Sequence, residues 1–301
     1  MPNDYVQLHQ KILAAFAEDK TLKGISLRSI PSFETSPWRS MLYKIPKAFS
    51  IINRLVHQRV RDKLIESYGQ KVIASLVANG ILPPDSGISG TEAWTLAFLM
   101  ELIVVRHEAW AAVEKLQAKN LKNPVFIDCG ANLGVFTLWL KINFPDAEVY
   151  TFEPVSRTFK IQSSLLSFWG LSSVYPQQLA VGDKRSELKM HVDPFLWGST
   201  LVNNPGQDPN LTETVTVVAL DDFLKENSIS KLDFLKVDVE GFEDRALKGA
   251  SKSIGAFKPI LYIAGHHRKD DSTRIPSIVL SIVPEYKSVK DEVLSTEFVF
   301  F

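Results

Sequence analysis

The chain has 301 residues, of which 45% are hydrophobic and 23% charged, and its 34 basic and 34 acidic residues give a formal net charge of zero. This composition is ordinary for a globular protein and lacks the basic excess of a nucleic-acid-binding protein, so we expect no nucleic-acid partner. The single cysteine, Cys129, excludes a disulfide within the chain and a cysteine-rich zinc site.

The sequence also bears on the cellular compartment. Its amino-terminal residues lack the basic start and apolar run of a signal peptide. The most apolar window, residues 93–105, is shorter than the roughly 20 residues that a membrane-spanning helix needs, and Glu101 interrupts it. We therefore expect a cytoplasmic protein without a transmembrane segment.

Residues 1–84 are predicted to form a separate helical segment. Within them, residues 39–79 carry apolar residues at helical spacing. The Gly- and Pro-rich stretch 80–90 is the strongest break in the chain, since both residue types interrupt helices and strands. We place the domain boundary there, so that a second domain covers residues 85–301.

The second domain begins with a helical pattern and continues as an alternation of strands and helices. Ser89 and Glu92 have the spacing of a capping box, and the apolar residues after them predict one long helix up to Leu116. The alternation that follows predicts a doubly wound, mostly parallel sheet, with an inserted hairpin and an antiparallel edge hairpin within residues 286–301. The expected strands span 125–129, 148–153, 174–181, 187–193, 213–219, 233–238 and 259–264, and the expected helices span 134–143, 155–169, 242–254 and 273–283.

The first predicted strand ends in a turn suited to a ligand, because doubly wound sheets bind ligands beyond the carboxyl ends of their strands. The turn reads Asp128-Cys-Gly130-Ala-Asn132-Leu-Gly134. Gly130 permits backbone shapes that a side chain forbids, and Gly134 opens a helix whose free N–H groups suit a carboxylate. Asn132 stands where a dinucleotide-binding turn has its middle glycine, which disfavours an NAD-dependent oxidoreductase.

Two acids follow the next predicted strands. Glu153 ends the second strand about 20 residues after the turn, where a carboxylate can hold both hydroxyls of a ribose. Asp183 follows the third strand and could bind an adenine amino group, although an acidic turn residue after Gly182 is equally compatible with the sequence. With the turn, these acids predict a nucleotide-containing cofactor.

Four blocks of sequence are distinctive, namely Phe126-Ile-Asp-Cys-Gly-Ala-Asn-Leu-Gly-Val-Phe-Thr137, Thr151-Phe-Glu-Pro154, Leu220-Asp-Asp-Phe-Leu224, and Phe234-Leu-Lys-Val-Asp-Val-Glu-Gly-Phe-Glu243 with Leu247-Lys-Gly-Ala250. Over roughly residues 90–265 the chain thereby resembles the FkbM family of methyltransferases. The resemblance implies a Rossmann-like class I methyltransferase fold, S-adenosylmethionine as cofactor, and O-methylation of a small-molecule or glycan hydroxyl. One departure is Ala264-Gly265, where the family commonly has an acid after the fifth strand.

Candidate catalytic residues lie at the carboxyl ends of the fourth and fifth strands. Asp238 and Glu240 leave the fourth strand, and His266 and His267 leave the fifth. A carboxylate or imidazole there could take the proton of an acceptor hydroxyl, and we assign Asp238, Glu240 and His266 to catalysis. The two acids could instead favour the dipole of the following helix. With a histidine they could also bind a divalent ion, although the spacing alone assigns no metal site.

The leading interpretation of the sequence is an O-methyltransferase that uses S-adenosylmethionine. The departure at Ala264-Gly265 keeps one alternative open, a methyltransferase-like binding or partner subunit that has lost turnover. The retained Asp128, Gly130, Glu153 and Asp238 favour the enzyme.

Overall fold

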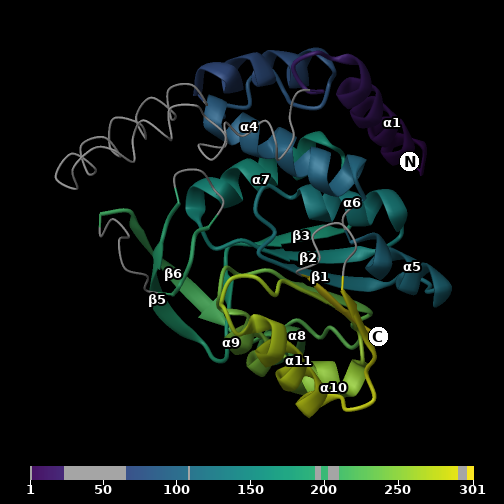
Figure 1. Ribbon diagram of the computed structural model, residues 1–301, viewed down its shortest axis with the longest axis vertical. Coiled ribbons are helices and arrows are strands. Elements are labelled where there is room, and N and C mark those ends of the chain that lie inside the picture. Colours follow the sequence, from purple (N-terminus) through teal and green to yellow (C-terminus); the bar gives the residue numbers. More distant parts are fainter. Residues whose placement is uncertain (1, 24–65, 108, 194–197, 203–209, 291–296) are drawn as a thin grey trace, which may run out of the picture. The chain divides into compact units, whose positions relative to one another are not determined.

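The computed structural model describes residues 2–23, 66–107, 109–193, 198–202, 210–290 and 297–301 (Figure 1). The chain divides into two compact units. One unit is Leu8–Val105, and the other combines Met1–Gln7 with Arg106–Phe301. Across the residues described, none of the helices combines the length and the hydropathy that crossing a bilayer requires.

The secondary structure described in the unit Leu8–Val105 consists of helices. It contains most of α1 (Pro2–Glu18) and a helix over residues 66–78. The last part of the predicted helix 39–79 is therefore helical, whereas residues 39–65 lie outside the described residues. The core of this unit includes the buried apolar side chains Ile12, Phe16, Leu22, Val72, Leu76 and Ile81.

The predicted long helix after Ser89 is wrong as a single element. Its start is correct, because the Ser89 side chain accepts a hydrogen bond from the Glu92 N–H and the Glu92 carboxylate accepts one from the Ser89 N–H. The helix is interrupted because His107 and Ala109 have positive φ angles of 57° and 64°, which helical backbone does not allow. The three elements are α4 (Gly90–Leu99), the π-helix η1 (Met100–Val105) and α5 (Trp110–Ala118).

A seven-stranded sheet forms the centre of the second unit, in the order β3-β2-β1-β7-β8-β10-β9. The first five of these strands run parallel, and β10 is antiparallel to both of its neighbours. The predicted Rossmann-like doubly wound sheet with an antiparallel C-terminal edge is thereby confirmed. The strands are β1 (Val125–Cys129), β2 (Glu148–Phe152), β3 (Val174–Gln177), β7 (Phe234–Val237), β8 (Ile260–Ile263), β9 (Ser288–Lys290) and β10 (Phe298–Phe300).

A smaller three-stranded sheet contains the predicted inserted hairpin. It has the order β4-β6-β5, with β5 (Ser186–His191) antiparallel to β6 (Thr212–Val218). The predicted third strand, 174–181, is wrong as one strand. After β3 the chain leaves the main sheet, and β4 (Ala180–Val181) pairs in parallel with β6 instead.

Helices cover both faces of the main sheet (Figure 1). On one face, Ile127 and Cys129 of β1 belong to a buried apolar cluster with residues of α9, α10 and α11, so Cys129 is a core residue as predicted. On the other face, Phe126 and Asp128 alternate toward α6. The predicted helix 242–254 is wrong as one helix, because it is broken at Ala250. The helices are α6 (Val135–Asn143), α7 (Ser156–Phe168), α8 (Leu220–Glu226), α9 (Glu243–Gly249), α10 (Ser251–Phe257) and α11 (Asp271–Ile282).

Candidate active site

The turn after β1 lies directly against the end of β7. Gly130 has a φ of +76°, and a Cβ built on it would lie 1.7 Å from the backbone oxygen of Asp238. No side chain fits into that space. Glycine is therefore required at position 130 both by the positive φ angle and by the adjacent backbone oxygen of Asp238. Gly134 caps α6 with a φ of 82°, and Asn132 also has a positive φ, of 49°. The turn therefore approaches β7 as closely as backbone atoms allow.

Glu153 lies beside this turn and is buried. Its carboxylate accepts hydrogen bonds from two backbone N–H groups, that of Asn132 at 3.1 Å and that of Val155 at 3.0 Å. Burial raises the pKa of Glu153 to about 7, although these two N–H groups act in the opposite direction. The side chain of Gln162 fixes the same turn, because its amide donates to the Asn132 carbonyl at 2.9 Å.

A buried ion pair joins β1 to β7 beneath the turn. Asp128 and Lys236 stand opposite each other in the sheet, and Lys236 Nζ lies 3.1 Å from Asp128 Oδ1. Thr137 donates to the other Asp128 oxygen at 2.7 Å. Lys236 also donates to the Gly130 carbonyl at 3.0 Å and lies 3.6 Å from Asp238. Burial alone would lower the pKa of Lys236, but Asp128 and Asp238 outweigh it and raise that pKa.

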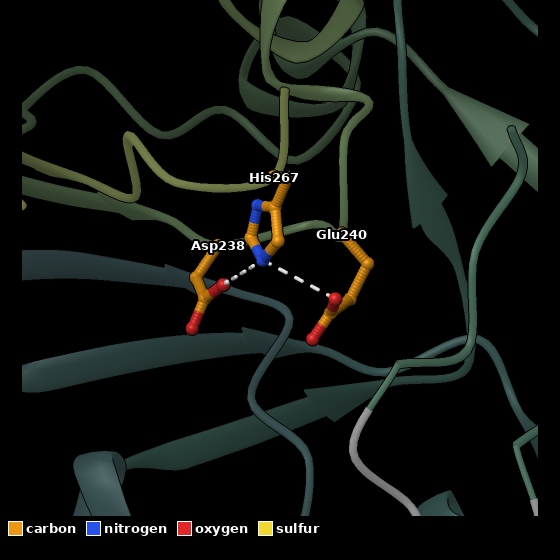
Figure 2. Close-up of side chains that lie close together, drawn as sticks. All are labelled: Asp238, Glu240 and His267. Carbon is orange, nitrogen blue, oxygen red and sulfur yellow. Dashed lines mark ion pairs between the residues drawn. The ribbon is translucent and has the colours of Figure 1, made fainter. Parts of the chain in front are cut away.

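Three side chains converge beyond the ends of β7 and β8 (Figure 2). His267 Nε2 lies 3.7 Å from Asp238 Oδ1 and 3.2 Å from Glu240 Oε2. The other ring nitrogen, Nδ1, lies 2.9 Å from Glu243 Oε1. Burial alone would lower the pKa of His267, but hydrogen bonds to Glu240 and Glu243 and the charges around the ring raise it to about 11. In the isolated chain the ring is therefore a cation among three carboxylates.

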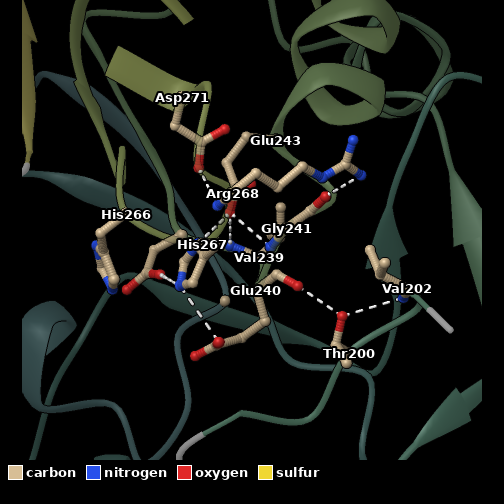
Figure 3. A network of polar contacts seen from close by, with 12 residues as sticks. Thr200, Val202, Val239, Glu240, Gly241, Glu243, His266, His267, Arg268 and Asp271 are labelled. Carbon is tan, nitrogen blue, oxygen red and sulfur yellow. Dashed lines mark hydrogen bonds and ion pairs between the residues drawn. The ribbon is translucent and has the colours of Figure 1, made fainter. Parts of the chain in front are cut away.

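The loop between β7 and α9 is held in a defined shape (Figure 3). Glu243 Oε1 accepts hydrogen bonds from the N–H groups of Val239 and Gly241, both at 3.1 Å. Glu240 has a positive φ of 55°, which is uncommon for a residue with a side chain. Its carbonyl accepts a hydrogen bond of 2.5 Å from Thr200, which comes from the insertion after β5. Contacts from two parts of the chain thus hold the Glu240 backbone in this conformation.

The structure brings two of the three residues assigned to catalysis together with a histidine. Asp238 and Glu240 share His267, whereas the ring of His266 pairs with Glu297 through Nδ1 and Oε1 at 3.1 Å. The two imidazole rings are neighbours, with centroids 4.2 Å apart. The hydrogen bond to Glu297 raises the pKa of His266, although burial acts against it.

Asp183 forms ion pairs with α9. Its Oδ2 lies 2.7 Å from Arg245 Nη1 and 3.9 Å from Lys248 Nζ. Burial would raise the pKa of Asp183, but Arg245 outweighs it and lowers that pKa. The role of Asp183 toward an adenine group stays a prediction.

Sequence reasoning assigned no role to two residues that support the site, Glu243 and Thr137. Glu243 anchors His267, and Thr137 anchors Asp128. Both belong to the distinctive blocks of sequence, which is the signal that could have drawn attention to them.

Comparison with known proteins places a family match within the unit that contains this site. A family described as "Methyltransferase FkbM domain" matches residues 128–292. "Methyltransferase 1" of Beauveria bassiana (strain ARSEF 2860) is 30% identical over 141 residues, which cover 41% of this chain and 57% of that protein. "Methyltransferase sdnD" of Sordaria araneosa is 30% identical over 161 residues, which cover 43% and 61%. The chain thus spans less than two thirds of the length of either relative.

Among solved structures, the methyltransferase FkbM from Methylobacillus flagellatus KT is similar with a TM-score of 0.46 and 19% identity. The match covers 77% of this chain and 58% of that chain.

Proposed function

This chain belongs to the FkbM methyltransferase family, and from that premise we propose that it moves a methyl group from S-adenosylmethionine to a hydroxyl of a small molecule or glycan. One observation carries the proposal. A buried carboxylate, Glu153, lies beside a glycine turn whose backbone touches the strand end that bears Asp238. A nucleotide-binding feature and a candidate proton acceptor are therefore neighbours, as methyl transfer to a hydroxyl requires.

The turn and its surroundings suit a nucleoside with an amino-acid tail. The Glu153 carboxylate would accept hydrogen bonds from the ribose hydroxyls, and Asp183 would accept one from the adenine amino group. The backbone between Gly130 and Gly134 would lie against the cofactor, with Asn132 at its centre and free N–H groups of α6 toward the methionine carboxylate. Asp128 would act through Thr137 and Lys236, which hold the turn in place.

The residues at the ends of β7 and β8 would serve the acceptor. When bound, S-adenosylmethionine supplies a methyl group on a sulfonium, and S-adenosylhomocysteine remains after transfer. Asp238, whose side chain is about one third exposed, would take the hydroxyl proton while the acceptor oxygen bonds to the methyl carbon. Glu240 would orient the hydroxyl, and His266, which is half exposed beside His267, would contact the rest of the acceptor.

Calorimetric titration with S-adenosylmethionine tests the cofactor part of this proposal. We expect the full chain to bind, and Glu153→Gln to bind at least about tenfold more weakly, because hydrogen bonds to a charged group contribute about 1.5–3 kcal/mol. Glu226→Gln is the matched control, since Glu226 is an exposed partner of Arg185. Absence of heat with the parent chain would exclude the cofactor, and equal affinity in Glu153→Gln would exclude the ribose assignment.

The pH dependence of cofactor binding gives a second test. With a pKa of about 7, Glu153 is mostly protonated at pH 6 and mostly ionised at pH 8. Only the ionised form offers both oxygens as acceptors, so affinity should rise about tenfold from pH 6 to pH 8 and then level off. The same titration of Glu153→Gln isolates this group, because any remaining slope belongs to the ligand. Equal slopes in both proteins would contradict the assignment.

The acceptor is found by incubating cell extracts with labelled cofactor and identifying labelled products by mass spectrometry. Transfer to an oxygen is the expected result. Cofactor binding without transfer to any component would favour the alternative of a binding or partner subunit.

A further inference from the structure

The Asp238, Glu240 and His267 side chains have the spacing of a coordination shell. One ligand atom from each, two carboxylate oxygens and one imidazole nitrogen, lie within 4.8 Å of one another. Around an octahedral ion with bonds of about 2.1 Å, adjacent ligands are about 3.0 Å apart and opposite ligands about 4.2 Å. The measured separations from His267 Nε2, 3.2 Å and 3.7 Å, fall within that range. Small side-chain shifts would place all three atoms on one ion.

An independent observation concerns Glu243, which lies on the far side of the His267 ring. Its side chain has no exposed surface, and its Oε1 faces His267 Nδ1 at 2.9 Å. This contact turns Nε2 toward Asp238 and Glu240. A carboxylate is one of the usual partners of the second ring nitrogen in a metal-binding histidine. Glu243 Oε2 is moreover buried without a hydrogen-bond partner among the described residues.

The charges around the cluster also favour a cation. Three carboxylates, those of Asp238, Glu240 and Glu243, surround a single imidazole. Lys236 is 3.6 Å from Asp238, but it lies closer to Asp128, at 3.1 Å, and divides its charge between the two acids. Even with the imidazole protonated, the three carboxylates leave a net negative charge, which a bound cation would offset. The cation would displace the proton from His267 Nε2, because a metal-binding imidazole nitrogen is deprotonated.

We propose that Asp238, Glu240 and His267 bind one divalent cation of the Mn²⁺ or Mg²⁺ class, with Glu243 holding the histidine from behind. Three protein ligands leave coordination positions open. The role of the cation in methyl transfer rests on the proposed function. The acceptor oxygen would occupy one of these open positions, where the cation would lower the pKa of the acceptor hydroxyl. The preferred acceptors would then carry a second oxygen next to the reacting hydroxyl, because two neighbouring oxygens chelate an ion.

Electron paramagnetic resonance with Mn²⁺ tests the site without cofactor or acceptor. The full chain is first stripped with a chelator, and the signal of free Mn²⁺ is followed as protein is added. We expect one saturable Mn²⁺ per chain, displaced by excess Mg²⁺. Glu240→Gln should weaken binding at least about tenfold, and Glu243→Gln, which leaves all three ligands in place, by about 10–100-fold.

Glu285→Gln is the matched control and should bind Mn²⁺ like the parent, because Glu285 pairs with Lys258 on the surface. Near-ultraviolet circular dichroism shows whether each variant keeps its fold. Two results would overturn the site: no loss of signal from the parent chain up to about 1 mM Mn²⁺, the weak end of protein sites, or equal binding by a folded Glu240→Gln. Calorimetry with S-adenosylmethionine in chelator is independent of the ion, so failure of the cofactor proposal would be seen separately.

Discussion

Asp238→Asn should lower the rate of methyl transfer by about 10²–10⁴-fold while leaving S-adenosylmethionine binding intact. Asparagine has the same shape as aspartate but cannot take a proton from the acceptor hydroxyl, and it is a poorer ligand for a cation. The Asp238 backbone, which touches Gly130, is unchanged by the substitution. The rate is measured as labelled methyl incorporated into the acceptor, and the affinity by calorimetry on the same preparation.

Asp222→Asn is the matched control for this experiment. Asp222 is an exposed acid in the first turn of α8, so its substitution should leave the rate unchanged. If Asp238→Asn bound cofactor normally and transferred methyl at the parental rate, Asp238 would have no part in activating the acceptor. If it lost cofactor binding as well, its role would be to support the turn.

Lys236→Met should lower the free energy of unfolding by about 3–5 kcal/mol, which makes it the most destabilising of the substitutions considered. Methionine fills much of the same volume beside Phe136 but leaves the buried Asp128 carboxylate without its cation. Urea unfolding followed by circular dichroism measures the change. Lys258→Met, which removes an exposed lysine paired with Glu285, is the control and should change little.

A second substitution separates charge from packing at Lys236. In the double variant Lys236→Met with Asp128→Leu, the buried charge is gone on both strands. It should therefore recover part of the stability lost by Lys236→Met alone, because an apolar pair can replace a buried ion pair. A double variant at least as unstable as the single one would show that the strands need the pair for its shape.

The main sheet could be predicted because short stretches of sequence mark where its strands begin and end. The apolar strand from Val125 to Cys129 is flanked by a proline and by a glycine turn, and its predicted bounds agree with β1. The strand 174–181 was predicted wrongly because its second half pairs with β6, more than thirty residues later in the chain. No local pattern specifies that choice of partner.

The candidate site shows the same contrast between features that follow from local sequence and features that depend on distant contacts. The positions of Glu153 and of the glycine turn follow from strand ends, which the sequence indicates. The choice between His266 and His267 does not follow from the strand end, because adjacent residues after a strand point in different directions. His267 meets Asp238 because Glu243, from the start of α9, fixes its ring. That contact depends on tertiary packing and cannot be read from spacing along the chain.

The contact between Gly130 and the Asp238 carbonyl means that no residue with a side chain fits at position 130. Even alanine would place its Cβ 1.7 Å from that oxygen, so a saturation library selected for S-adenosylmethionine binding should return glycine alone. Gly198 offers the contrast, because a Cβ there would meet nothing closer than 3.7 Å. Position 198 could therefore carry side chains that change the surroundings of Glu240, whose Oε2 lies 3.7 Å from that Cβ, while the glycine turn is held constant.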